Sequence, residues 1–422
     1  MYLADSRRPA ASAAAPALGP GRAARIAPTV LALGTVSLIT DVSSEMVTAV
    51  LPLYLVTALG VTPLGFGLLD GVLNGASAAL RLLGGLLGDR GGGRHKAVAT
   101  AGYGLSALCR PALLLARTTP LIGLVLAVDR VGKGLRTAPR DAMISLATPP
   151  ERRGRAFGVH RAMDTAGALT GPLLAFLILR AAPGGFHAVF TVSSYVAALG
   201  VLVLVLLVPG RSLRSTPART ARPRSRGLLR RPALRRITAC ASLLGLATVS
   251  DSFLYLLLQR RLELPAAWFP LLPLGTAAVY LLLAVPVGTL ADRIGRRRLF
   301  VLGHAALLAA YALLLVRPGA GAPLAAAVLA LHGIFYAATD GILAATAAGA
   351  VPEAQRGAGL ALVGTGQAAG RFACSLAVGA LWSRWGDTTA LAVMAVALTA
   401  AVAIATRLLG PHPEHRRREE TS

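Results

Sequence analysis

The chain contains two copies of one short motif, Gly85-Leu-Leu-Gly-Asp-Arg-Gly-Gly-Gly-Arg94 and Gly288-Thr-Leu-Ala-Asp-Arg-Ile-Gly-Arg-Arg297. The aspartates of the two copies, Asp89 and Asp292, are 203 residues apart. A second pair of short motifs, Arg153-Gly154 and Arg356-Gly357, repeats at the same offset. Two independent motifs in one register indicate an internal duplication of the whole chain.

Each half of the duplication consists mainly of apolar segments. The chain has 422 residues, of which 55% are hydrophobic and 14% charged, whereas about a quarter of the residues of a soluble protein are charged. Apolar segments of about 17–25 residues, long enough to cross a bilayer as helices, recur along it. We therefore predict an all-α membrane protein with twelve transmembrane helices in two six-helix, pseudo-symmetric bundles. The expected spans are 28–58, 63–88, 97–116, 120–140, 155–180, 187–208, 237–259, 267–290, 299–316, 323–350, 358–382 and 388–408.

The formal net charge of +25 is unevenly placed. Of the 43 Lys and Arg, 27 fall in the termini and in the loops after even-numbered spans, and five in the other loops. The positive-inside rule then places both termini in the cytoplasm of a multi-pass protein of the cell membrane. Residues 209–236 contain ten Arg and no acid, which favours a solvated linker that contacts membrane lipids over a nucleic-acid site.

This placement predicts the domain organisation. The expected parts are a disordered cytoplasmic tail (1–27), an N-terminal six-helix bundle (28–208), a basic cytoplasmic linker (209–236), a C-terminal six-helix bundle (237–409) and a cytoplasmic tail (410–422).

The repeated motif resembles the signature loop of the major facilitator superfamily (MFS). The C-terminal copy matches it fully, whereas the N-terminal copy has Gly93 in place of a basic residue. The resemblance implies the MFS fold, a substrate site between the halves and a cytoplasmic gate at these loops. The residues that it assigns to the gate are Gly85, Asp89, Arg90, Arg94, Gly288, Asp292, Arg293, Gly295 and Arg297. The structural alternative is a turn that only orients the chain.

Further motifs narrow the resemblance. Arg130-x-x-x-Gly134 resembles the helix 4 motif of the superfamily, and Gly167-x-x-x-Gly171-Pro172 partly resembles the helix 5 motif of antiporters. The stretches Asp41-x-Ser-Ser-Glu-Met46, Asp129 to Asp141 and Phe157-Gly-x-His-Arg-Ala-Met-Asp164 are similar to a largely uncharacterised prokaryotic permease subgroup.

Ionisable residues stand at membrane depth in several spans. Such residues are rare and usually face a functional interior. In the resembled fold, helices 1, 4, 7 and 10 line the cavity and helices 2, 5, 8 and 11 flank it, and most of these residues belong to those helices. Arg110 in the third span is an exception that we interpret as structural. The candidates for substrate binding or proton coupling are Asp41, Glu45, Asp129, Arg130, Lys133, Arg161, Asp164, Asp251, His332 and Arg371.

Asp41 and Glu45 are four residues apart and so share one helix face. Two carboxylates on one face repel each other when both are ionised, which favours proton uptake by the pair, and exchange with Arg130 could couple protons to gating. The alternative is a static, charge-balanced network that holds the helices together. Arg161 and Asp164 are one turn apart and can satisfy each other. At the repeat offset of 203 residues, the C-terminal half carries His332 where the N-terminal half carries Asp129. The two halves are therefore not equivalent, and we expect the polar site to lean toward the N-terminal half.

The sequence predicts a monomeric secondary transporter for a small molecule, working by alternating access with proton coupling, and slightly favours efflux. It contains no nucleotide-binding loop, no constellation of catalytic residues and no metal or cofactor motif. The basic cluster of the fourth span hints at the alternative of an uptake permease for an anionic or zwitterionic solute. A membrane receptor or sensor that does not transport is the competing class.

Overall fold

The computed structural model describes residues 26–73, 95–209, 231–315, 321–340, 342–352 and 356–408, and all regular structure within these ranges is helical. The first half contains α1 (Pro28–Leu53, continued by a π-helical turn, Tyr54–Ala58), a helix at Pro63–Leu73, α3 (His95–Leu115), α4 (Thr119–Leu146), a 3₁₀ turn (Pro150–Arg152), α5 (Arg153–Ala181) and α6 (Phe186–Leu207). The second half contains α7 (Pro232–Ala247), α8 (Asp251–Arg261), the 3₁₀ turn η4 (Ala266–Trp268), α9 (Leu271–Ile294), α10 (Arg296–Leu315), α11 (Gly321–Thr339), α12 (Ile342–Gly349) and α13 (Arg356–Leu408).

The long helices are apolar enough to cross a membrane. Nine candidate spans lie within the described residues. They include none for α4, which is rich in charged residues, and none in the second predicted span, where the described part is the shorter apolar helix Pro63–Leu73. The eleventh and twelfth predicted spans form one assigned helix, α13, that bends at Gly386 (φ 83°, ψ 169°). The all-α membrane fold is therefore confirmed, whereas the count of twelve stays a prediction.

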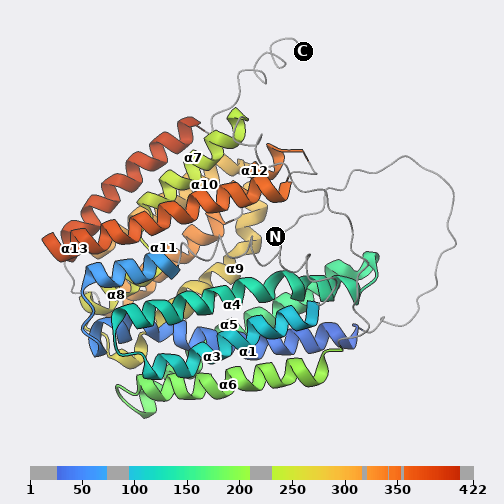
Figure 1. The fold of residues 1–422 in the computed structure, drawn as a ribbon. Helices are drawn as coiled ribbons and strands as arrows, with labels where there is room; N and C mark the ends of the chain where they lie inside the picture. Colours follow the sequence, from blue (N-terminus) through green and yellow to red (C-terminus); the bar gives the residue numbers. More distant parts are fainter. Residues whose placement is uncertain are drawn as a thin grey trace, which may run out of the picture.

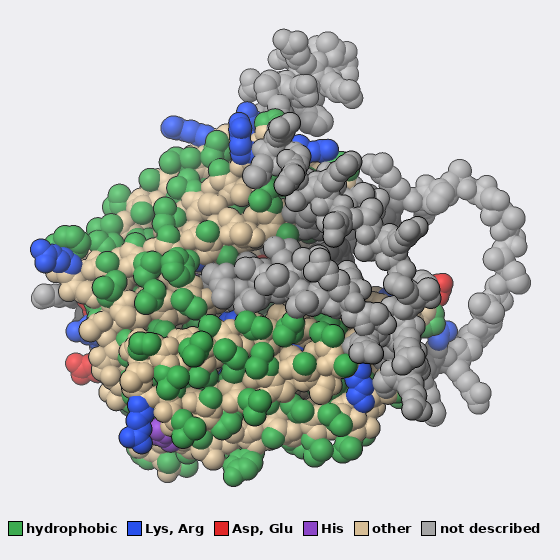
Figure 2. All heavy atoms as spheres, viewed as in Figure 1, with side chains coloured by type: hydrophobic (Ala, Val, Ile, Leu, Met, Phe, Trp, Pro, Cys, Tyr) green, Lys and Arg blue, Asp and Glu red, His purple; other side chains and the backbone are tan. Residues whose placement is uncertain are grey.

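The outer surface explains why these helices need a membrane. In Figure 2 hydrophobic side chains cover the visible face of the described part, and most charged side chains lie toward its edges. Large apolar side chains point outward, among them Leu115 (79% exposed) and Leu282 (76%). In a bilayer, helices satisfy their own backbone hydrogen bonds, and such side chains contact lipid.

The helices form two groups with the same pattern of neighbours (Figure 1). In the first half α5 and α6 pack on α1, and α4 packs on α3. In the second half α13 packs on α7, and α11 packs on α10. A Cβ atom at Gly167 of α5 would collide with the Leu38 carbonyl of α1, and one at Gly370 of α13 would collide with the Ser242 carbonyl of α7. Gly167 and Gly370 are again 203 residues apart, so the sequence repeat recurs as a repeated helix contact.

Two of the predicted spans are interrupted in the second half. α7 ends at Ala247 and α8 begins at Asp251, with three non-helical residues between them. The tenth predicted span is divided into α11 and α12 near Asp340. Backbone that leaves the helix at membrane depth is tolerated where it is buried in protein or lines a cavity. α7 itself starts at Pro232, before the expected boundary at 237.

Candidate functional site: a cavity between the two halves

A cavity of about 600 Å³ lies between the two helix groups. This volume falls in the range of small-molecule sites. Its walls come from α1, the Pro63–Leu73 helix, α4, α5, the junction of α7 with α8, α9, α11 and α13. The polar side chains in these walls are Glu45, Thr48, Asp70, Arg130, Thr248, Ser250, Asp251, Ser252, Tyr255, Thr276, Tyr280, Tyr336, Asp340 and Arg371. Most of them belong to the second half of the chain, whereas we expected the polar site to lean toward the first half.

Asp251 is the centre of the polar cluster on the second-half wall. It stands in the first turn of α8, directly after the interruption, and its side chain keeps 46% of its area accessible. The Tyr336 hydroxyl donates to both of its carboxylate oxygens, at 2.7 and 2.9 Å, and His332 Nε2 lies 3.3 Å from Oδ1. His332 is 2% exposed, so this imidazole supports Asp251 from behind and does not face the cavity.

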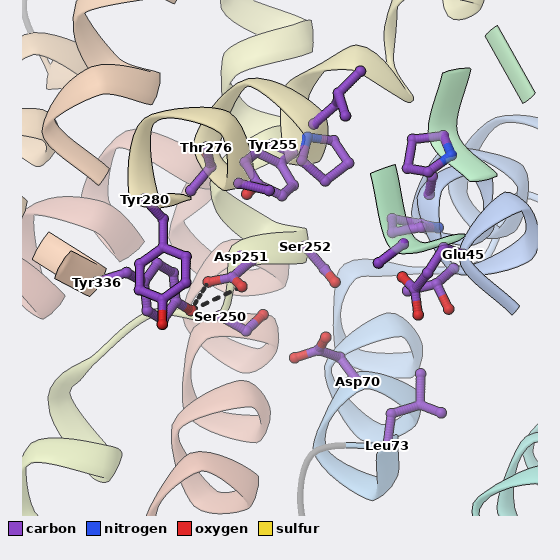
Figure 3. A pocket seen from close by; sticks show the side chains of 18 of the residues that line it. Glu45, Asp70, Leu73, Ser250, Asp251, Ser252, Tyr255, Thr276, Tyr280 and Tyr336 are labelled. Carbon is purple, nitrogen blue, oxygen red and sulfur yellow. Dashed lines mark hydrogen bonds between the residues drawn. The ribbon is translucent and has the colours of Figure 1, made fainter. Parts of the chain in front are cut away.

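Asp70 connects the cavity to the contact between the halves. It belongs to the Pro63–Leu73 helix and is 3% exposed. The Ser375 hydroxyl of α13 donates to Asp70 Oδ2 at 2.6 Å. Figure 3 shows Asp70 and Asp251 on one side of the open space and Glu45 on the other. The candidates predicted from the sequence do not include Asp70, although a lone carboxylate within the predicted second span would have identified it.

The helix that carries Asp70 packs closely against α13, on the side of the molecule that we predict to be extracellular. A Cβ atom at Gly67 would collide with the Ser375 carbonyl, and one at Gly379 would lie 2.6 Å from the Pro63 carbonyl. The Leu64 amide donates to Ser383 Oγ at 3.0 Å. We call this contact between the Pro63–Leu73 helix and α13 the gate contact. Phe66 extends it toward α8, because its ring meets that of Phe253 edge to face at 4.9 Å.

The basic residues of α4 are mostly neutralised within the first half. Arg110 of α3, which we interpreted as structural, pairs with Asp129 at 2.9 Å, and Lys133 lies 3.9 Å from the same carboxylate. Arg136 pairs with Asp41 at 3.1 Å. Arg140 bridges Asp141 at 3.0 Å and Asp164 at 3.6 Å. We call these pairs the α4 network.

The predicted site residues therefore separate into two sets of four, with His332 and Arg161 outside both. Glu45, Arg130, Asp251 and Arg371 line the cavity. Asp41, Asp129, Lys133 and Asp164 belong to the α4 network, and His332 contacts Asp251. Arg161 is exposed, and its expected partner Asp164 pairs with Arg140 instead.

The predicted gating motifs are only partly described. Gly85, Asp89, Arg90 and Arg94 lie outside the described residues, as do the side chains of Asp292 and Arg297. In the second motif, Gly288 belongs to α9 and Arg293 is exposed. Gly295 separates α9 from α10 with φ of 89°, a conformation that favours glycine.

The cavity residues that the sequence patterns did not single out are mainly aromatic. Tyr255, Tyr280 and Tyr336 line the second-half wall, and tyrosines in apolar helices are otherwise indistinguishable from packing residues. Within the described residues, no group of three His, Cys, Asp or Glu side chains is placed to hold a metal ion.

Long apolar helices around a polar central cavity define a multi-pass membrane transporter. The family model of the Major Facilitator Superfamily matches residues 33–279 and 271–422. The chain belongs to this superfamily. An uncharacterised MFS-type transporter of Methanocaldococcus jannaschii is 32% identical over 281 residues, which cover 64% of this chain and 68% of that protein. An uncharacterised protein of Mycobacterium tuberculosis is 36% identical over 175 residues, which cover 42% of this chain and 40% of that protein.

Solved transporter structures share the fold. A nucleoside transporter superimposes with a TM-score of 0.78 at 13% identity, covering 90% of this chain and 100% of that chain. A POT family transporter in complex with a thioalcohol-conjugated peptide gives 0.74 at 14% identity, with 90% and 95% covered. An inward-facing bacterial homologue of the human lysosomal transporter Spinster gives 0.71 at 14% identity, with 90% and 96% covered. At these identities the similarity concerns the fold alone.

Proposed function

We propose that this protein is a proton-coupled secondary active transporter, not an enzyme, and that it moves a small molecule across the cytoplasmic membrane by alternating access. The observation that carries the proposal is the central cavity, whose charged side chains come from both helix groups: Glu45, Asp70 and Arg130 from the first, and Asp251, Asp340 and Arg371 from the second. A site shared by two bundles is exposed to either side when the bundles rock against each other.

The gate contact supports this proposal. It joins the two halves through a few small residues and two hydrogen bonds, from the Ser375 hydroxyl to Asp70 and from the Leu64 amide to Ser383 Oγ. Small residues allow close approach without interlocking side chains, so the contact can separate as a unit. A receptor without transport would have no need of a separable contact beside its ligand cavity.

Proton coupling is assigned to the carboxylates at and around the cavity. Glu45 faces the cavity one helical turn after Asp41, which pairs with Arg136 of the α4 network. Protonation of Glu45 or Asp251 would reduce the negative charge of the cavity wall. The Asp41–Arg136 ion pair lies one helical turn from Glu45 and would respond to this loss of charge. Charge exchange between the cavity and the α4 network would then move α1 relative to α4.

Efflux is slightly favoured as the direction. Gly167 and Gly171 of the antiporter-like motif pack directly on α1, where a Cβ atom at Gly171 would lie 2.8 Å from Glu45 Cβ. The motif therefore lies beside a candidate coupling residue. Uptake of an anionic or zwitterionic solute is the second candidate, because Arg130 and Arg371 also line the cavity.

The test is a distance measurement that needs no known substrate. Spin labels at Val56→Cys and Trp385→Cys, on exposed positions of the two halves, report whether the predicted extracellular end opens. The pair Val56→Cys and Leu115→Cys lies within the first half and serves as the control. We expect two distance populations for the first pair, with proportions that change with pH, and one constant population for the control.

The coupling residues are tested in the same background. Glu45→Gln and Asp41→Asn should each weaken the pH response of the Val56–Trp385 distance while leaving both populations present. A single distance at every pH in the parent protein would contradict alternating access. An unchanged pH response in both variants would remove these two carboxylates from the coupling role.

A further inference from the structure

We propose that the transported molecule is an organic cation, such as an amine, held by the carboxylates of the cavity and by its tyrosine wall. The proposal rests on the proposed transport function and adds the chemical class of the substrate. It starts from how the acidic residues of the membrane helices are partitioned between the cavity and its surroundings.

Among the described residues of the membrane helices, acids outside the cavity are paired with basic residues. Asp41, Asp129, Asp141 and Asp164 each lie within ion-pair distance of an Arg. The other four Asp and Glu of the expected spans all line the cavity: Glu45, Asp70, Asp251 and Asp340. Burying a charge is costly unless it is paired, and the acids outside the cavity meet this requirement with a basic partner from the protein itself.

Three of the cavity carboxylates accept hydrogen bonds from hydroxyl groups, and Asp251 also contacts the His332 imidazole. Tyr336 donates to Asp251, and the Tyr280 hydroxyl donates to Asp340 Oδ2 at 2.9 Å. Ser375 donates to Asp70. Across the described ranges, no Arg or Lys lies within ion-pair distance of Glu45, Asp251 or Asp340. Hydroxyl donors orient a carboxylate without removing its charge, which leaves the charge available to a ligand.

The charge balance of the lining favours a cation. Four carboxylates face two guanidinium groups, Arg130 and Arg371, in a chain whose formal net charge is +25. Arg371 interacts electrostatically with Asp251 and Asp70, and Lys133 with Glu45. Even with Lys133 included, four carboxylates outnumber three Lys and Arg, so the cavity is negative when these side chains are ionised.

The shape of the second-half wall also suits a cation with an organic body. Tyr255, Tyr280, Tyr336 and Phe269 line it together, and the rings of Tyr280 and Tyr336 lie edge to face at 6.5 Å. Aromatic faces attract ammonium groups. In Figure 3 these tyrosines and Asp251 stand opposite Glu45, so a ligand between them would meet a carboxylate on each side.

The basic cluster that hinted at an anionic substrate points elsewhere in the structure. Lys133, Arg136 and Arg140 are held by acids of the α4 network, and only Arg130 of the cluster lines the cavity. Arg130 and Arg371 then provide donors for a hydroxyl or carbonyl group on the cationic ligand.

The experiment measures the charge preference of the cavity with thiol reagents, and no substrate needs to be known. Cys109, Cys240 and Cys374 are buried and are replaced by Ala. A reporter cysteine is introduced at Ala277, which lines the cavity on α9. Its reaction rate is measured with a cationic reagent, trimethylammonium-ethyl methanethiosulfonate, and with an anionic one, sulfonatoethyl methanethiosulfonate. The free thiol 2-mercaptoethanol and the exposed loop variant Ala182→Cys give the reference rates for the same two reagents. Ser252→Cys, on α8, gives a second reporter in the cavity lining.

We expect the cation-to-anion rate ratio at Ala277→Cys to exceed that of 2-mercaptoethanol by about tenfold or more. Asp251→Asn and Glu45→Gln should each lower the ratio. Asp387→Asn should leave it unchanged, because Asp387 pairs with Arg260 and Arg261 away from the cavity.

A ratio at or below the reference for both reporters would overturn the cationic class and leave alternating access untouched. The same holds if the ratio is insensitive to both cavity variants. Reporters that react with neither reagent would reject a ligand-accessible cavity and the proposal with it. Failure of alternating access shows separately, as a single spin-label distance.

Discussion

Adding one methyl group at the gate contact should open it. An ideal Cβ atom at Gly67 would collide with the Ser375 carbonyl oxygen and would lie 3.2 Å from Gly379 Cα. Both neighbours are backbone atoms, so a Gly67→Ala side chain cannot be accommodated by a rotamer change. Overpacking of this kind costs about 1–3 kcal/mol. Because only the closed state contains the contact, the ratio of closed to open molecules should fall by about 5- to 150-fold.

The assay is the Val56–Trp385 spin-label distance in purified protein at fixed pH. The matched control is Gly104→Ala on α3, where an added Cβ has no neighbour within 4 Å. The control should keep the distance distribution of the parent, whereas Gly67→Ala should transfer population to the longer distance. Gly379→Ala, on the other side of the contact, should act in the same direction and covers the case in which Gly67→Ala does not fold. The reasoning is refuted if both gate variants match the parent.

Three further changes test the surrounding structure by unfolding of the purified protein. Arg110→Leu should lower the free energy of unfolding by about 3–5 kcal/mol, because it leaves Asp129 buried without its closest partner. Adding Asp129→Leu should recover most of this loss. If the losses of the two single variants simply add in the double variant, the two residues do not act as a pair. Tyr336→Phe should cost about 1.5–3 kcal/mol, since it removes hydrogen bonds to a charged group, and it should cost almost nothing in an Asp251→Leu background. Gly295→Ala should cost about 1–3 kcal/mol from its positive-φ backbone alone (φ 89°, ψ 137°), because no atom of the described residues lies within 4 Å of the new Cβ. A neutral effect would contradict that conformation.

Much of the fold could be predicted from the sequence because the bilayer fixes the length of an apolar helix. The first predicted span, 28–58, coincides with α1 and its π-helical turn, and the fifth, 155–180, lies within α5. The 203-residue offset also predicted a symmetry that recurs in the contacts of Gly167 and Gly370. These features depend on local composition and spacing, which the sequence contains.

The interruptions of the helices could not be predicted in the same way. The residues between α7 and α8, Thr248 to Ser250, carry no proline or glycine that would mark a break. The break is stabilised by contacts from other helices: the Val249 amide donates to the Tyr311 hydroxyl at 3.0 Å, and Cys374 Sγ donates to the Thr248 carbonyl at 3.2 Å. Such partners are known only once the helices are assembled.

The composition of the site was predictable only in part for a related reason. Helical spacing shows which charges of α4 share a face, but not which helix that face meets. Asp129 and Arg130 are adjacent in sequence, and yet Asp129 faces Arg110 of α3 while Arg130 lines the cavity. The hundred-degree turn between neighbouring residues separates a structural ion pair from a candidate binding residue.

The two charge systems of the membrane helices then have different physical requirements. A charge in the α4 network has a fixed partner, so replacing it removes a structural interaction and should lower stability. A charge on the cavity wall faces open space, so replacing it should affect binding and coupling more than folding. Glu45 lies one turn from Asp41 on α1 and belongs to the second system, while Asp41 belongs to the first. We therefore expect Asp41→Asn to lower the unfolding temperature and Glu45→Gln to leave it nearly unchanged while lowering the cation preference of the cavity. Equal losses of stability in the two variants would show that the cavity carboxylates are structural as well.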